Sequence, residues 1–197
     1  MAAYFGWHEP WFLAPISLLS SFLKEKNVRI RTFQLMVVGC LALSGGLLLL
    51  VVSANAAATV VALGASNTYG KGVGRDQAFP AQLEAILRAR GYSVNVVNAG
   101  INGNTTEEML NRLDSAVPNG TRAVILQPGG NDRRKGRTDR TAEIQSHLRA
   151  RGIRVIMLGN NMLRGLPHQP DGMHLTPDGY RMLAQSLASQ VAGAIGR

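Results

Sequence analysis

The chain has 197 residues, of which 46% are hydrophobic, enough for one domain with a sizeable core. Its single cysteine, Cys40, excludes an intramolecular disulfide framework. The formal net charge of +9 would suit an anionic partner, but the only dense basic cluster, Arg133-Arg134-Lys135, has no interleaved aromatic residues. We interpret this cluster as a solvated basic surface and expect no nucleic-acid partner.

The first part of the chain, residues 1–56, carries an export pattern. An apolar run over residues 35–52 follows the basic residues Lys24, Lys26, Arg29 and Arg31, and small residues follow the run. This pattern is typical of a signal peptide cleaved after Ala56. An uncleaved membrane anchor is the alternative, because a bilayer span needs about 20 residues. Either way we expect residues 57–197 outside the cytoplasm: periplasmic, secreted, or anchored to the inner membrane through the N-terminal segment alone.

Strand-like apolar runs alternate with amphipathic helical patterns after residue 57. We expect strands at residues 59–63, 93–98, 122–127 and 153–158. We expect helices at residues 80–90, 105–117, 138–151 and from 176 onward, the second opened by the capping-box pattern Thr105-Thr106-Glu107-Glu108. The alternation predicts a three-layer α/β/α fold with a doubly wound, mostly parallel sheet and helices on both faces.

Polar residues follow the first three predicted strands. Ser66 comes two residues after the first strand ends at a glycine, residues 98–105 form a turn rich in glycine and asparagine, and residues 127–132 offer the amide of Asn131. Because ligands collect at the carboxyl ends of parallel strands, these three turns predict a nucleophile with oxyanion donors beside it. A serine in such a position is more commonly a simple turn residue, so Ser66 needs support from elsewhere in the chain.

That support comes from Asp171 and His174, just before the last predicted helix. A carboxylate three residues before a histidine can accept a hydrogen bond from Nδ1–H, which leaves Nε2 to take a proton from Ser66. His147 and His168 lack such an acid and are interpreted as surface residues.

These blocks resemble, in order, the motifs of the SGNH (GDSL-type) hydrolases. The matching segments are Gly64-Ala65-Ser66-Asn67, Gly103 within residues 99–105, Gly130-Asn131-Asp132, and Asp171 with His174. The resemblance covers residues 59–192 and is greatest to small bacterial lysophospholipases, thioesterases and arylesterases. It implies a flavodoxin-like sheet and a small ester, thioester or lysophospholipid substrate.

The same resemblance implies roles for individual residues. Ser66 would be the nucleophile, His174 the general base and Asp171 the group that orients His174. The backbone amides of Ser66 and Gly103 and the side chain of Asn131 would form the oxyanion hole.

The sequence departs from the family pattern in two places. Ala65 stands where the family has an aspartate, so the carboxylate that braces the nucleophile turn is missing. Only residues 159–170 separate the fourth predicted strand from Asp171. We therefore expect a shortened member with four strands, without the family's usual fifth, and with a more open pocket.

Other motifs fit poorly. A phosphate-binding loop ending at Gly70-Lys71 would need a glycine at Ala65 and a hydroxyl residue at Gly72. The α/β-hydrolase elbow would need a glycine at Thr68, and no spacing of histidine and cysteine suits zinc. We expect no cofactor and no metal.

The sequence thus predicts an exported serine hydrolase for carboxylic esters. The alternative is a non-catalytic, membrane-tethered binding domain that keeps the fold.

Overall fold

A four-stranded parallel sheet forms the centre of the fold. The computed structural model describes residues 56–196, so the apolar run at 35–52 and its basic flank lie outside the described residues. The strands are β1 (Ala58–Gly64), β2 (Val94–Gly100), β3 (Thr121–Gln127) and β4 (Arg154–Met157), in the order β2-β1-β3-β4. All pairings are parallel, which confirms the predicted sheet. Within residues 56–196, no helix combines the length and apolar character needed to cross a membrane.

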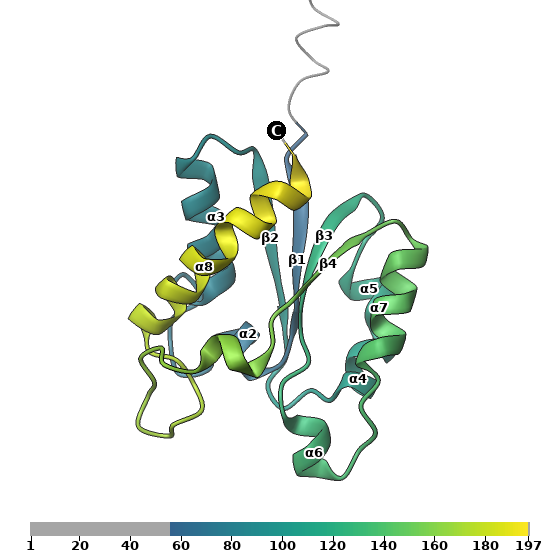
Figure 1. Ribbon diagram of the computed structural model, residues 1–197, viewed down its shortest axis with the longest axis vertical. Helices are drawn as coiled ribbons and strands as arrows, with labels where there is room; N and C mark the ends of the chain where they lie inside the picture. The colour runs from purple at the N-terminus through teal and green to yellow at the C-terminus, as the bar shows by residue number, and fades with distance from the viewer. Residues whose placement is uncertain (1–55, 197) are drawn as a thin grey trace, which may run out of the picture. The chain divides into compact units, whose positions relative to one another are not determined.

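Helices cover both faces of this sheet, as predicted (Figure 1). One face carries α3 (Phe79–Ala89) and α8 (Pro177–Ile195), and the other carries α4 (Thr106–Asn111), α5 (Leu113–Ala116) and α7 (Thr141–Ala150). Alternate strand residues belong to two apolar clusters, with Val60 and Ala62 in the first and Val61 and Leu63 in the second. Side chains of successive strand residues point to opposite faces, so each cluster is one face of the sheet with its covering helices.

The helix boundaries follow the sequence signals closely. Thr105 caps α4 with the predicted capping box, its hydroxyl accepting from Glu108 N–H while the Glu108 carboxylate accepts from Thr105 N–H. The predicted helix over residues 105–117 is divided at Arg112, which ends α4 and precedes α5. The predicted helix over residues 138–151 begins only at Thr141.

Three short helices were not expected from the sequence. They are α2 (Ser66–Tyr69), α6 (Asn131–Lys135) and the 3₁₀ helix η1 (Asn160–Leu163), each following the carboxyl end of a strand. Helices of four or five residues are too short to show an apolar period, which explains why the sequence did not reveal them. Ser66 and Asn131 are therefore the first residues of short helices, where the sequence had predicted loops.

Two glycines let α2 lie directly against the ends of β1 and β2. A Cβ added at Gly100 would lie 2.2 Å from the Tyr69 backbone nitrogen, and one added at Gly64 would lie 2.2 Å from the Thr68 hydroxyl oxygen. Any larger residue at either position would push α2 away from the sheet. These glycines thus set the position of the helix that begins with Ser66.

The segment between β4 and α8 contains η1 and one isolated antiparallel bridge, His168 to Leu175. In the part of the chain that the structure describes, no fifth strand extends the sheet beyond β4. This agrees with the predicted shortened fold. In place of a fifth strand, η1 and the loop after it follow β4 along the chain.

Candidate active site

A cavity of about 320 Å³ lies at the carboxyl edge of the sheet. Its lining includes Ser66 at the start of α2, Asn131 at the start of α6 and His174 from the loop before α8. These residues lie far apart in the sequence but follow neighbouring strands or precede the last helix. The tertiary structure thus brings together three of the residues that the sequence predicted for the site.

Ser66 is half-buried at the edge of this cavity. As the first residue of α2, it has a backbone N–H without a partner inside the helix, because the first N–H groups of a helix lack an intrahelical acceptor. Ser66 Oγ makes no hydrogen bond to the His174 ring, although both residues line the cavity. Catalytic hydrogen bonds often form only once substrate is bound, so the missing hydrogen bond is compatible with proton transfer between these two residues.

Asp171 accepts three hydrogen bonds, two from His174 and one from the preceding residue, Met173. Its Oδ2 lies 2.5 Å from His174 Nδ1, and its Oδ1 accepts from the backbone N–H groups of Met173 and His174, at 2.9 and 3.0 Å. A carboxylate accepts at Nδ1, so the proton of a neutral ring lies there and Nε2 has a lone pair. The His174 side chain is 5% exposed, which fixes the ring further.

These hydrogen bonds also act on the carboxylate. The pKa of Asp171 lies well below its usual range, first because of the hydrogen bond from the His174 ring and then because of the two backbone N–H groups. Asp171 therefore remains an anion at any pH at which the protein would normally act. A permanent negative charge next to Nδ1 favours the protonated imidazole that forms when Nε2 takes a proton.

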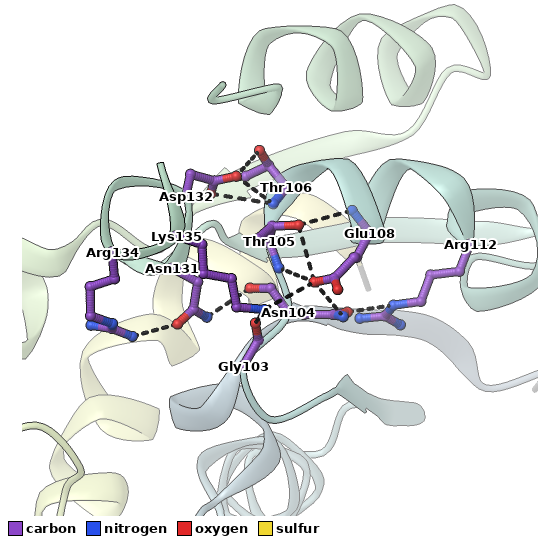
Figure 2. A network of polar contacts seen from close by, with 10 residues as sticks. All are labelled: Gly103, Asn104, Thr105, Thr106, Glu108, Arg112, Asn131, Asp132, Arg134 and Lys135. Carbon is purple, nitrogen blue, oxygen red and sulfur yellow. Dashed lines mark hydrogen bonds and ion pairs between the residues drawn. The ribbon is translucent and has the colours of Figure 1, made fainter. Parts of the chain in front are cut away.

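Asn131 is fixed by its neighbours on both sides of its amide (Figure 2). Its Nδ2 donates to the Asn104 carbonyl at 2.7 Å, and its Oδ1 accepts from the Arg134 guanidinium. The amide nitrogen has two N–H groups, so one remains for an oxygen in the cavity. The next residue, Asp132, is buried and accepts from the N–H and the hydroxyl of Thr106, which joins α6 to the start of α4.

Gly103 lies beside this network but is not among the residues that line the cavity. Its φ of +76° is in the left-handed region, and its carbonyl accepts from Lys135 Nζ at 2.8 Å. Among residues 56–196, its N–H has no hydrogen-bond partner. The adjacent residue, Asn104, accepts from Arg112 Nε at 2.9 Å through its side chain and from Asn131 through its carbonyl (Figure 2).

Three residues that support the site were not identified from the sequence. Gln127 Oε1 accepts from the Ala65 N–H and the Thr68 hydroxyl, both at 3.1 Å, and so braces the turn where the family aspartate is absent. Asn67 donates to the Met173 carbonyl and accepts from the Tyr180 hydroxyl. The only sequence signal was their position: Asn67 ends the nucleophile motif, Gln127 ends a predicted strand, and Tyr180 lies in the apolar stripe of the last predicted helix.

The cavity also contains residues that the sequence assigned to the surface. His168 lines it and is half-buried, with Nδ1 2.6 Å from the Leu166 carbonyl, so its interpretation as a surface histidine is wrong. His147 is exposed on α7, as expected. Arg133, Arg134 and Arg164 line the cavity as well. Across residues 56–196, no three His, Cys, Asp or Glu side chains are grouped so that they could hold a metal ion.

Fold and cavity together define a class: doubly wound α/β proteins with a serine, a His–Asp pair and an asparagine amide at the carboxyl edge of the sheet. The chain belongs to the GDSL-like lipase/acylhydrolase family, the SGNH hydrolases, whose sequence profile matches residues 62–188. The resemblance noted in the sequence is thereby confirmed.

Similar proteins agree with this assignment. Esterase TesA of Pseudomonas aeruginosa is 34% identical over 133 residues, which are 64% of this chain and 63% of that protein. The chain thus spans somewhat less than two thirds of the length of this relative. A crystal structure of TesA superimposes with a TM-score of 0.58 at 23% identity, covering 69% of this chain and 99% of that one. The psychrotrophic esterase EstA from Pseudoalteromonas sp. gives a TM-score of 0.57 at 14% identity, covering 68% and 97%.

Proposed function

We propose that the protein is an exported serine esterase that hydrolyses short carboxylic esters, including thioesters. The observation that carries the proposal is the meeting of Ser66, His174 and Asn131 in the lining of one cavity, with Asp171 bonded to His174 Nδ1. Family membership and the similarity to esterase TesA support it. Export is supported by the basic and apolar pattern before residue 57, which would leave the domain periplasmic, secreted or anchored outside the inner membrane.

The proposed reaction has two halves. Ser66 Oγ attacks the acyl carbonyl while His174 Nε2 takes the hydroxyl proton, and the carbonyl oxygen becomes an oxyanion. As the tetrahedral intermediate collapses, the bond to the alcohol or thiol breaks and His174 gives its proton to the leaving group. Water then attacks the acyl-enzyme, again losing a proton to His174, and Ser66 regains that proton as the carboxylic acid leaves.

The oxyanion would be held by three donors. They are the Ser66 N–H, which has no helical partner, the Gly103 N–H, and the second N–H of the Asn131 amide. Fixed donors of this kind stabilise charge that develops in the transition state, and removing one typically costs about a hundredfold or more in kcat. The hydrogen bonds from Arg134 and to Asn104 fix the Asn131 amide before substrate arrives.

The direct test is release of p-nitrophenol from short-chain p-nitrophenyl esters. Ser66→Ala and His174→Ala should each lower kcat/KM by about a thousandfold or more, and Asp171→Asn by less, since Asp171 acts only through the His174 ring. Ser146→Ala and His147→Ala, both exposed on α7, are the matched controls and should keep the wild-type rate. A wild-type rate in Ser66→Ala would disprove the assignment.

Labelling with a fluorophosphonate separates this proposal from a binding domain without turnover. An activated Ser66 reacts with the probe, and Ser66→Ala does not. A wild-type protein that stays unlabelled and hydrolyses no ester would support the non-catalytic, membrane-tethered alternative. N-terminal sequencing of the protein recovered from the cell envelope and medium would test export and cleavage after Ala56.

A further inference from the structure

The wall of the cavity that contains Ser66 carries an unusual charge. Arg133 and Arg134, from α6, and Arg164, directly after η1, all line it, and no aspartate or glutamate does. The nearby Asp171 carries one negative charge but does not line the cavity, and its carboxylate is directed at the His174 ring and two backbone N–H groups. The cavity is therefore a concave surface of positive charge next to the candidate nucleophile.

These guanidinium groups are not neutralised by other side chains. Within residues 56–196, the side chains of Arg133 and Arg164 have no hydrogen bond or ion pair, and the Arg134 side chain donates only to the neutral amide of Asn131. Outside the cavity, four of the described arginines form ion pairs with acids, namely Arg88, Arg140, Arg151 and Arg181. Seven other described arginines outside the cavity also lack an acidic partner, so the cavity is distinguished by three such guanidinium groups in one hollow without a carboxylate in its lining.

The three arginines are exposed, as the sequence predicted for Arg133 and Arg134, but they do not form one continuous basic face. Arg133 and Arg164 follow different strands, β3 and β4, yet line the same hollow as Ser66. By contrast, Lys135 belongs to the same basic run but bonds to the Gly103 carbonyl, 3.8 Å from the Glu108 carboxylate, and does not line the cavity. Only the part of the run that lines the cavity lacks an acidic partner.

The volume of the cavity and its other lining residues limit the size and chemistry of the ligands that can bind. A volume of about 320 Å³ is at the lower end of the range for small-molecule sites, roughly 300 to 1,000 Å³. Leu163 and Met173 provide a small apolar area. A planar guanidinium matches a carboxylate or phosphate through two parallel hydrogen bonds.

We propose that the substrate is a short ester carrying a carboxylate or phosphate group near the scissile carbonyl, and that Arg133 and Arg164 select it through this charge. The proposal rests on the esterase function proposed above. Arg134 contributes to the same field, but its bond to Asn131 also gives it a role in positioning the amide. The anionic group could lie on the acyl side or on the leaving group, and substrates of both kinds distinguish these cases.

The experiment compares pairs of esters that differ in one charge. Mono-p-nitrophenyl glutarate and its methyl ester test the acyl side, and 4-acetoxybenzoate and its methyl ester test the leaving group. For the full-length wild-type chain, we expect kcat/KM to favour the anionic member of at least one pair by about tenfold, as expected for a hydrogen-bonded charge. Raising the ionic strength from about 0.05 to about 0.5 M should shrink that advantage.

Variants connect the preference to the arginines. Arg133→Gln and Arg164→Gln should each reduce the anionic-to-neutral ratio several-fold, and the double variant should bring it close to one. Arg122→Gln is the matched control, since Arg122 is exposed at the start of β3, at the opposite edge of the sheet, and should keep the wild-type ratio. Arg133→Glu should also bring the ratio close to one, since it leaves the same net positive charge in the lining as the double variant.

Two results would overturn the inference. Neutral esters hydrolysed at least as well as their anionic partners would remove the preference, and a double variant with the wild-type ratio would remove the arginines as its cause. In both cases, turnover of neutral esters and fluorophosphonate labelling of Ser66 would leave the esterase proposal standing. Absence of turnover and of labelling would refute the esterase proposal, and this inference with it.

Discussion

Asn67 and Tyr180 are 113 residues apart in the sequence and joined by a buried hydrogen bond. The Tyr180 hydroxyl donates to Asn67 Oδ1 at 3.1 Å, and Asn67 Nδ2 donates to the Met173 carbonyl at 3.1 Å. Asn67 follows Ser66, and Met173 precedes His174. A residue of α8 therefore ties the helix that carries the candidate nucleophile to the loop that carries the candidate base.

We expect Tyr180→Phe to destabilise the protein by about 1–3 kcal/mol, because Asn67 Oδ1 would remain buried without a donor. Burial raises the pKa of Tyr180 to about 12, so the hydroxyl is a donor throughout the neutral range. Esterase activity should also fall, since Asn67 would no longer be held in the orientation that reaches Met173. Urea unfolding and an ester assay measure the two effects.

Tyr92→Phe is the control for this change, because Tyr92 packs on the same apolar cluster and its hydroxyl has no partner among residues 56–196. Its stability should stay within a few tenths of a kcal/mol of wild type. Equal stability of the two variants would show that the Tyr180–Asn67 bond contributes nothing.

Acid should destabilise the protein partly through Asp171. The pKa of Asp171 is lowered in the folded state, first by the His174 ring, so folding favours the anion. Below the ordinary aspartate pKa of about 3.9, the unfolded chain binds a proton at this position and the folded chain does not. The stabilisation is therefore complete above that pH and is lost as the pH falls toward the lowered value.

Comparing wild type with Asp171→Asn isolates this contribution. The free energy of unfolding, measured in urea at pH 5 and at pH 3, should fall further for wild type than for the variant, which has no carboxyl group at this position. Asp178→Asn is the control, since Asp178 is exposed in α8 and pairs only with Arg181 at the surface. Equal pH dependence in wild type and Asp171→Asn would contradict this prediction.

Gln127 should be necessary for the nucleophile turn. Gln127→Met would leave the Ala65 N–H and the Thr68 hydroxyl, both buried, without their acceptor. We expect a loss of about 2 kcal/mol in the free energy of unfolding and slower fluorophosphonate labelling of Ser66. Gln190→Met, at an exposed position of α8, should change neither. Normal labelling in Gln127→Met would show that the turn holds its geometry without this brace.

Arg112 should act on the oxyanion side of the site. Its guanidinium donates to the Asn104 side chain at 2.9 Å (Figure 2). It also donates to the Ala99 carbonyl at 2.8 Å, and burial lowers the pKa of Arg112. Arg112→Met should free the loop of Gly103 and Asn104. Because oxyanion donors act in the transition state, kcat should fall about tenfold or more while KM changes little.

The control for Arg112 is Arg122→Met, which removes a charge at the opposite edge of the sheet. It should keep both kinetic constants. If Arg112→Met raised KM and left kcat unchanged, Arg112 would contribute to substrate binding and not to the oxyanion donors.

The sequence by itself determined the four strands, the longer helices and the order of the motifs. Apolar runs of strand length and apolar stripes at helical spacing are local patterns, and the buried residues Tyr180, Leu183, Leu187 and Val191 of α8 lie where that spacing placed them. The strand exits at Ser66 and Asn131 were recognisable because parallel strands place their carboxyl ends at one edge. The Asp171–His174 pair was predictable because both residues lie in one short loop.

Only the tertiary structure decided which residues surround that pair. The strand order β2-β1-β3-β4 brings Gln127 of β3 beside the turn after β1, and α8 brings Tyr180 to Asn67. Arg133 and Arg164 come to one cavity in the same way, although nothing near either residue in the sequence distinguishes it from a surface arginine. Contacts between distant segments depend on how the layers pack, and residue periodicity has no information about that packing.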